Sequence, residues 1–267
     1  MDKLVSIIVN CFNGAKYLDE CLKSISNQKY KNWEVIFWDN QSSDNSKKIF
    51  FSFMSKDKRF KYFYSKKHVP LYEGRNLACS RAKGDFLAFL DTDDTWSDEF
   101  LESRSKHFYD DKYDFFYSNF FHYFEKEKKK ILFTNSKLDS GKIFNFLAKN
   151  YLVKISTLIV RKRVFDNEKK FNKNYNIIGD FELVMRMSEK YNFLANQEPL
   201  AQIRFHQNNF LNLHRDMFYT EYKNWYLNID FSKKEWSKNR SRFIFKLLHL
   251  YLVKLIPSFV INFLRKK

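Results

Sequence analysis

The sequence contains few cysteine, proline and glycine residues. Its 267 residues include 3 Cys, 3 Pro and 5 Gly. Cys11, Cys21 and Cys79 are too few for a disulfide framework, and none has the spacing of a metal ligand. A reducing cytoplasm is therefore expected. No stretch rich in Pro, Gly or Ser indicates a flexible linker between domains.

Long uninterrupted apolar runs are also lacking. The N-terminal run at residues 4–9 is too short for a signal peptide and is followed by no small-residue cleavage site, so it predicts a first strand. Residues 243–264 are rich in Leu, Phe and Ile, but Lys246, His249, Lys254 and Pro257 interrupt them. These interruptions argue against a transmembrane helix.

Acidic residues are outnumbered by basic ones. The net charge is +17 and the pI is near 9.6, which predicts attraction to polyanions. The sequence shows no zinc finger, no RNA-binding RNP motif and no basic helix beside leucine heptads. An anionic membrane or a nucleotide is therefore favoured as partner, and no nucleic acid is expected. A hydrophobic content of 44% is typical of a globular protein.

Apolar strands alternate with amphipathic helices in the first hundred residues. Strands are predicted at 4–9, 34–38, 61–64 and 86–90, and helices at 15–28, 45–54 and 73–82. This alternation predicts an α/β fold, with a mostly parallel sheet flanked by helices. In such sheets ligands bind beyond the carboxyl ends of the strands.

The second half is less regular. Strands are predicted at 114–124, 156–160 and 199–205, and helices at 143–150 and 180–190. We divide the chain into a domain at 1–215, with halves at about 1–100 and 101–215, and a helical extension at 216–267.

Three carboxylates follow the most apolar strand, in the stretch FLAFLDTDD. Asp91, Asp93 and Asp94 repel one another, and a buried carboxylate is costly unless it is paired or bound to metal. Oxygen ligands suit Mg²⁺ or Mn²⁺, ions that also hold substrate phosphates. The alternative is a polar loop in which Asp94 or Thr95 caps a following helix.

The C-terminal stretch at 243–264 has apolar residues at helical spacing. It is basic and ends in Arg265-Lys266-Lys267. A helix of this composition is typical of one that lies in a membrane interface. Two alternatives stay open: packing of this helix on the domain, and a contact in a homodimer.

The order of several motifs resembles the family 2 glycosyltransferases of the GT-A fold. These motifs are LVSIIVNCFNGAKYLDECLKSISNQ, WEVIFWDNQSSDNS and GRNLACSRAKGDFLAFLDTDD, followed later by Gly179-Asp180 and IRFHQNN at 203–209. The resemblance, to members that build bacterial surface polysaccharide, implies inverting transfer of a sugar from a nucleotide diphosphate sugar. It covers residues 3 to 100 most clearly.

The resemblance also implies roles for the residues around the aspartates. Asp91 and Asp93 match the DXD motif that binds Mn²⁺ or Mg²⁺ and, through it, the diphosphate. Asp94 is a further candidate metal ligand, and Thr92 is counted with the donor-binding residues. Arg75 falls where the family often has a basic residue near the diphosphate.

Three more residues match the family's nucleotide-binding positions. Asp39 resembles the aspartate that accepts a hydrogen bond from the base, usually uracil. Asn10 and Asn13 line the nucleotide side of the first strand. The family commonly has Pro-Thr-Tyr-Asn where this chain has Asn10-Cys11-Phe12-Asn13, and Asp-Asp-Gly-Ser where it has Asp39-Asn40-Gln41-Ser42.

The resemblance identifies Asp180 as the general base that takes the acceptor hydroxyl proton. His206 matches a position near the metal or diphosphate. The alternatives are that Asp180 is a helix cap and that His206 is structural.

The implied donor is a UDP-sugar, and the implied acceptor is a glycan or a lipid-linked sugar at the inner face of the cytoplasmic membrane. A nucleotidyltransferase would carry a glycine-rich loop after its first strand, which is absent. The remaining alternative is a non-catalytic basic module on an α/β scaffold that binds polyanions or membranes.

Overall fold

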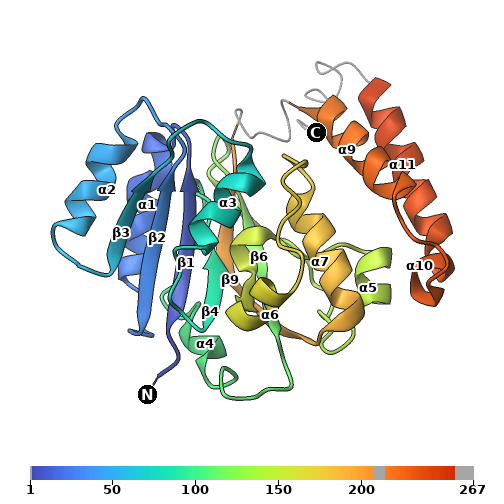
Figure 1. Cartoon of the computed structure of the whole chain (residues 1–267), viewed down its shortest axis with the longest axis horizontal. Coiled ribbons are helices and arrows are strands. Elements are labelled where there is room, and N and C mark those ends of the chain that lie inside the picture. The colour runs from blue at the N-terminus through green and yellow to red at the C-terminus, as the bar shows by residue number, and fades with distance from the viewer. Residues whose placement is uncertain (1, 207–213, 256–267) are drawn as a thin grey trace. The chain divides into compact units, whose positions relative to one another are not determined.

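The computed structural model describes residues 2–206 and 214–255 (Figure 1). They belong to two compact units. The first comprises residues 1–143 and 152–206, and the second comprises residues 144–151 and 207–267. The domain boundary that we predict at residue 215 stays a prediction. No helix in the described ranges is both long and apolar enough to cross a membrane.

The first unit begins with four parallel strands in the order β3-β2-β1-β4. They are β1 (Val5–Cys11), β2 (Trp33–Asp39), β3 (Phe60–Tyr64) and β4 (Phe86–Phe89). Helices α1 (Ala15–Ser26), α2 (Ser46–Met54) and α3 (Leu71–Cys79) connect them. The predicted α/β alternation is thus confirmed, with shifts of at most three residues at the element ends.

Both faces of these strands are covered. Alternate residues of β1 point to opposite sides: Val5, Ile7 and Val9 pack in one core cluster with the apolar face of α1. Helix α3 lies on the other side, and Figure 1 shows it in front of the strands. This coverage leaves the carboxyl ends of the strands as the accessible edge.

The rest of the sheet is mixed in direction. It continues from β4 through β8 (Ile159–Arg161), β6 (Phe115–Phe124) and β9 (Phe193–Phe205) to β5 (Thr95–Trp96), with β7 (Lys129–Leu132) beside β6. Strands β6 and β9 are parallel to each other, whereas β8, β5 and β7 pair antiparallel with their neighbours. Helices α4 (Glu102–Ser105), α6 (Lys162–Asn167) and α7 (Gly179–Lys190) complete the unit.

Two predicted elements differ from the structure. Residues 156–160 are not one strand, because a 3₁₀ turn at Ile155–Thr157 precedes β8. The last strand is longer than predicted and begins at Phe193. Pro199 does not start it, because the proline lies within the strand, where the pairing with β6 is irregular. The short helices α4 and α6 have too few turns to show a helical period, and the sequence did not predict them.

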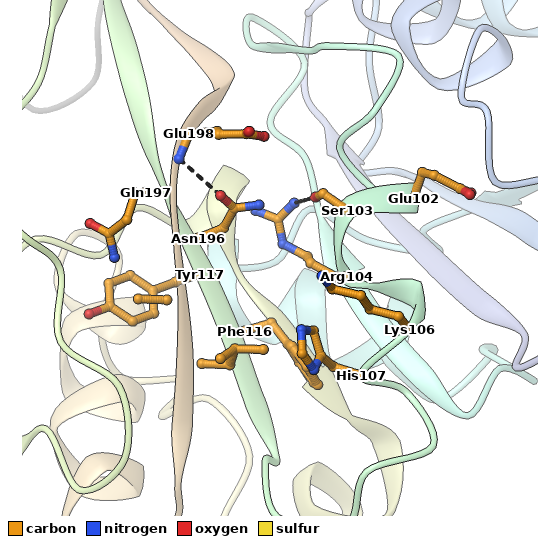
Figure 2. A pocket seen from close by; sticks show the side chains of 12 residues that line it. Glu102, Ser103, Arg104, Lys106, His107, Phe116, Tyr117, Asn196, Gln197 and Glu198 are labelled. Atoms are coloured by element: carbon orange, nitrogen blue, oxygen red, sulfur yellow. Dashed lines mark hydrogen bonds between the residues drawn. The ribbon is translucent and has the colours of Figure 1, made fainter.

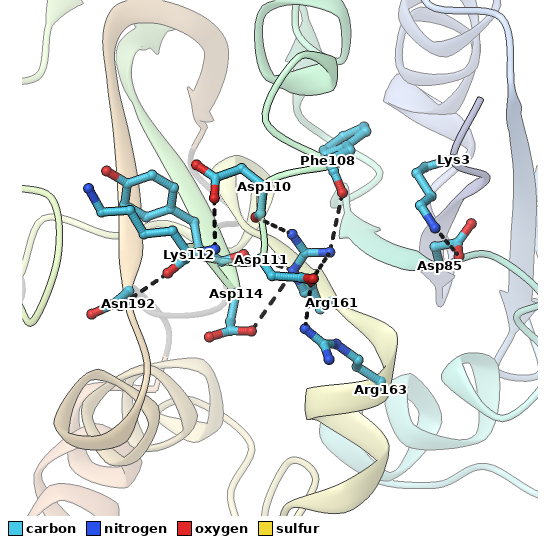
Figure 3. A network of polar contacts seen from close by, with 11 residues as sticks. Lys3, Asp85, Phe108, Asp110, Asp111, Lys112, Asp114, Arg161, Arg163 and Asn192 are labelled. Carbon is cyan, nitrogen blue, oxygen red and sulfur yellow. Dashed lines mark hydrogen bonds and ion pairs between the residues drawn. The ribbon is translucent and has the colours of Figure 1, made fainter. Parts of the chain in front are cut away.

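Arg161, at the end of β8, forms hydrogen bonds with the loop before β6 (Figure 3). Its guanidinium donates to the carbonyls of Tyr113 (2.8 Å) and Phe108 (3.2 Å) and to that of Asp110. The Asp114 carboxylate lies 3.9 Å from Arg161 Nε. A buried cation is here surrounded by acceptors, as its desolvation requires.

The second unit contains α5 (Phe144–Lys149), α9 (Arg215–Leu227), α10 (Lys234–Lys238) and α11 (Arg240–Leu255). Its core is aromatic: Trp225, Trp236 and Phe243 contact one another, and Phe144 contacts the last two. The predicted C-terminal helix is confirmed up to Leu255. Its continuation through Pro257 to 264, the basic end at 265–267 and the motif residues 207–209 lie outside the described residues.

Candidate active site

The three aspartates come together directly after β4. One carboxylate oxygen from each of Asp91, Asp93 and Asp94 lies within 4.8 Å of the others. Such a cluster is electrostatically unfavourable without a cation. Burial raises the pKa of Asp94 well above its usual value, and the charges of Asp93 and Asp91 raise it further. Oxygen donors at this spacing fit a hard divalent cation.

Asp94 does not cap a helix, because the chain continues into strand β5. Its carboxylate is buried and accepts hydrogen bonds on both oxygens, from the Ser156 hydroxyl (2.6 Å) and the Arg204 backbone N–H (3.0 Å). The Ser156 hydroxyl also accepts a hydrogen bond from the Asp91 backbone N–H (3.2 Å). The cap alternative is therefore wrong, and the loop after β4 is held by Ser156, in the 3₁₀ turn before β8, and by Arg204 in β9.

The other two aspartates each contact a cationic or titratable partner. Arg75 on α3 is 3% exposed and forms an ion pair with Asp91 Oδ1. Desolvation raises the pKa of Asp91, and the Arg75 guanidinium opposes that shift. His206 Nε2 lies 3.1 Å from Asp93 Oδ2. Arg75 and His206 thus both adjoin the aspartate cluster, and their roles toward the diphosphate and the metal stay predictions.

Asp180 lies in the first turn of α7. Its Oδ1 accepts hydrogen bonds from the Tyr72 hydroxyl and the Phe181 N–H, both at 2.9 Å. No described residue donates to Oδ2. A Cβ at Gly179 would lie 2.4 Å from the Tyr72 ring, so only glycine allows this close approach. The helix start and the carboxylate are therefore both fixed against Tyr72.

Helix α3 connects the base candidate with the metal cluster. Tyr72 and Arg75 are three residues apart, on one face of the helix, and the Arg75 guanidinium lies 5.0 Å from the centre of the Tyr72 ring. Tyr72 holds Asp180 and Arg75 holds Asp91. Gly74, between them, allows Asn10 at the end of β1 to approach, since a Cβ there would lie 2.9 Å from Asn10 Oδ1.

The predicted nucleotide residues lie at the ends of β1 and β2. Asp39 is fully buried, and its carboxylate accepts hydrogen bonds from the Ser42 N–H (2.7 Å) and the Tyr62 hydroxyl (2.6 Å). Its role toward a base stays a prediction. Asn13 has φ 53°, a left-handed conformation that Asn tolerates, and accepts the Ser43 N–H at 2.8 Å.

Asn10 and Thr92 lie on the inner side of the same edge. Asn10 Oδ1 is buried and has no hydrogen-bond partner among the residues that the structure describes. The Thr92 side chain packs against Gly14, which precedes α1. Phe12 is 54% exposed, with its ring 4.4 Å from that of His68. An unpaired amide oxygen and an exposed ring are features of a surface that receives a ligand.

Sequence reasoning missed three residues that hold the site together. Tyr72 positions Asp180, Ser156 anchors Asp94, and Arg204 binds the Asp93 carbonyl (3.0 Å) while pairing with Glu20. Tyr72 lies one helical turn before Arg75, and this spacing could have indicated that both side chains face the site. Arg204 lies in the IRFHQNN motif, two residues before His206, which was a usable signal as well, whereas Ser156 comes from a distant segment and gave none.

The family model described as "Glycosyl transferase family 2" matches residues 6–168. A similar curated relative is the UDP-Glc:alpha-D-GlcNAc-diphosphoundecaprenol beta-1,3-glucosyltransferase WfgD of Escherichia coli. It is 34% identical over 120 residues, which cover 45% of this chain and 46% of the relative. In the other curated relatives compared, the match covers 18% to 62% of their length.

Two solved structures share the fold. S. aureus TarS 1-349 in complex with UDP-GlcNAc has a TM-score of 0.64 at 18% identity, covering 90% of this chain and 71% of that one. The mannosyltransferase PcManGT from Pyrobaculum calidifontis, in complex with GDP-Man and Mn²⁺, has a TM-score of 0.64 at 12% identity and covers 98% and 79%. These likenesses confirm the predicted GT-A fold.

Proposed function

This chain belongs to glycosyl transferase family 2, and we propose on that basis that it transfers a sugar from a nucleotide diphosphate sugar with inversion, assisted by a divalent metal. One observation carries the proposal. Helix α3 contacts the aspartate cluster through Arg75 and Asp180 through Tyr72, so one helix holds both the proposed cation site and the proposed general base.

The proposed donor is a UDP-hexose or UDP-N-acetylhexosamine. WfgD is named for UDP-Glc, and TarS was solved with UDP-GlcNAc. The nucleotide would lie along the ends of β1 and β2, against Asn10, Asn13 and Asp39. Thr92 would lie beside the diphosphate. The exposed Phe12 ring offers an apolar surface at this edge.

The metal site is proposed at Asp91, Asp93 and Asp94, for Mn²⁺ or Mg²⁺. The unfavourable clustering of three carboxylates supports a cation there, and PcManGT was solved with Mn²⁺. When bound, the ion neutralises charge on the departing diphosphate. Arg75 orients Asp91, and His206 orients Asp93 or joins the ligands.

Asp180 is proposed as the general base. Its Oδ1 is held by the Tyr72 hydroxyl and the Phe181 N–H, which leaves Oδ2 to accept the proton of the acceptor hydroxyl. The hydroxyl oxygen then forms the new glycosidic bond as the diphosphate leaves from the opposite face. A single displacement inverts the anomeric centre and needs no enzyme nucleophile.

The proposed acceptor is a glycan or lipid-linked sugar of a bacterial surface polysaccharide. The name of WfgD specifies a diphosphoundecaprenol-linked acceptor. Such an acceptor would place this chain at the inner face of the cytoplasmic membrane as a peripheral protein.

Helix α11 supports that placement. One side of it exposes apolar side chains, Arg242 and Lys246 are exposed elsewhere on the helix, and Lys254 pairs with Asp216 on α9 (3.6 Å). The exposed apolar residues are Ile244, Phe245, Leu248, Tyr251, Leu252 and Leu255. An apolar stripe beside cations is typical of a helix that lies in an anionic membrane interface.

Calorimetric titration of UDP, GDP, CDP and dTDP, each with and without Mn²⁺, tests the donor site. We expect UDP to bind and its affinity to depend on Mn²⁺. If only another nucleotide binds, the proposed donor is a sugar of that nucleotide instead. Metal-independent binding, or no binding, would contradict the proposed donor and metal site.

Sedimentation with vesicles of phosphatidylglycerol and phosphatidylcholine tests the membrane contact. Leu248→Asp with Leu252→Asp should release the protein from the vesicles, because charge on the stripe opposes insertion. Leu227→Asp, on α9 and 66% exposed, is the matched control and should bind as wild type does. Equal binding of all three proteins would rule out the α11 stripe.

A further inference from the structure

The first unit contains a cavity bounded by α4 and by the amino-terminal parts of β6 and β9 (Figure 2). Its volume is about 620 Å³. Its polar lining residues include Ser103, Arg104, Lys106, His107, Asn196 and Glu198. Cavities of roughly 300–1,000 Å³ are typical of small-molecule sites.

Arg104 is the unusual member of this lining. It is 2% exposed, and its guanidinium lies 4.0 Å from the centre of the Phe100 ring. Nη1 donates to the Phe100 carbonyl and to the Ser103 hydroxyl (3.0 Å). Nε and Nη2 are buried, and no described residue accepts a hydrogen bond from either. Figure 2 shows the guanidinium pointing from α4 toward β9, on which Asn196 and Glu198 lie.

The charge of Arg104 is also unmatched. No ion pair joins it to a carboxylate in the described ranges, whereas Arg75, Arg161 and Arg204 each have one. Burial lowers the pKa of Arg104 to about 9, and the charge of Glu198 opposes that shift. The side chain is therefore still cationic at neutral pH. An unpaired buried cation is costly, so its retention indicates a missing partner.

We propose that this cavity binds a small molecule through an oxyanion group, a phosphate or a carboxylate, at the Nε and Nη2 donors of Arg104. These two N–H groups form the planar fork that matches two oxygens of one oxyanion. Lys106 and His107 add positive or donor groups to the lining, while Glu102 and Glu198 disfavour an anion. The attraction of the bound anion to Arg104 would have to exceed its repulsion by the Glu198 carboxylate.

This site is separate from the proposed donor site. Tyr117 lines the cavity, whereas Phe124, at the other end of β6, pairs with Phe205, which adjoins His206. Seven residues of strand span about 23 Å. Binding at Arg104 therefore places the ligand away from the proposed site of the reacting sugar.

Titration of the metal-free, ¹⁵N-labelled full chain with inorganic phosphate tests this, with the arginine Nε–Hε signals as readout. Arg104→Lys identifies the Arg104 signal. We expect that signal to shift saturably with phosphate in wild type and in Asp93→Ala, which separates this site from the donor site. Glu198→Gln should tighten phosphate binding about fivefold, because it removes an opposing charge.

Arg104→Met should abolish the saturable binding, and its far-ultraviolet circular dichroism checks its fold. Replacement of the exposed Lys48, on α2 and outside the cavity lining, by Met is the matched control. An unmoved Arg104 signal would overturn the proposal, as would equal phosphate binding by Arg104→Met. If Glu198→Gln weakens binding and lowers the Tm, Glu198 is itself the partner and the proposal fails. The wild-type and Glu198→Gln results decide the question even if Arg104→Met does not fold.

Discussion

Two parts of the same sheet differ in how their buried charges are neutralised. At the ends of β2 and β4, Asp39 is held by Ser42 and Tyr62, and Arg75 faces Asp91. Around β6 and β9, Arg104 has two unpartnered donors, and His122 Nε2 has no partner among the described residues. At the proposed catalytic edge the buried Asp39 and Arg75 are thus paired within the protein, although the aspartate cluster still calls for a cation. In the other region the Arg104 guanidinium is paired with no carboxylate of the described residues.

The largest expected effect follows from removing the base. Asp180→Asn should lower kcat about 10²- to 10⁴-fold, because the amide cannot take the acceptor proton. UDP affinity should stay within about twofold, since Tyr72 can still donate to the amide oxygen. Steady-state transfer assays and calorimetry measure the two quantities. The exposed Asp139→Asn is the control, and wild-type turnover by Asp180→Asn would exclude it as the base.

Asp93→Ala should remove Mn²⁺-dependent UDP binding, with a loss of about 100-fold or more. The reason is that Asp93 has a carboxylate in the cluster and contacts His206. Calorimetry with and without Mn²⁺ measures it. An unchanged dependence on Mn²⁺ would place the metal elsewhere.

The two buried arginines allow a direct comparison of stability. Arg75→Met should lower the free energy of unfolding by about 3 kcal/mol, at the low end for a buried pair because the Asp91 side chain is 36% exposed. Arg104→Met should not lower it, since the change removes a costly buried cation and leaves no paired carboxylate behind. Urea unfolding of both variants measures this. Equal losses would mean that Arg104 is already neutralised in the free protein.

A further expected effect concerns pH. Burial lowers the pKa of His122 to about 4, and Lys154 adds to this. Between pH 6.5 and about 4 the unfolded chain binds more protons, so the free energy of unfolding falls on acidification. The slope is at most about 1.4 kcal/mol per pH unit. Urea unfolding of His122→Gln should show a smaller fall over this range than wild type does, and identical curves would contradict the prediction.

Much of the fold was predictable because the first hundred residues follow simple periods. The runs at β1, β2 and β4 are buried on both faces, and α1 carries Leu18, Leu22 and Ile25 on one side. The second half has long aromatic runs that fit a strand or a core equally well. The hairpin of β6 and β7 and the short α6 depend on tertiary contacts that no local pattern reveals.

The candidate site also contains residues that the sequence revealed and residues that it did not. The carboxylates were visible because they follow directly after strands, and Asp180 because it opens a helix after Gly179. The groups that orient them were not. Ser156 contacts Asp94 across 62 residues and Tyr72 contacts Asp180 across 108. Only the folded chain brings such partners together.

The spacing of Tyr72 and Arg75 on α3 has a consequence for how the site tolerates change. Three helical residues advance about 4.5 Å along the axis, and this one step sets the separation between the group that holds Asp180 and the group that holds Asp91. One residue inserted between them would turn one partner by roughly 100° around the helix. Tyr72 and Arg75 could then no longer hold Asp180 and Asp91 at the same time, although every proposed catalytic side chain remained in the sequence.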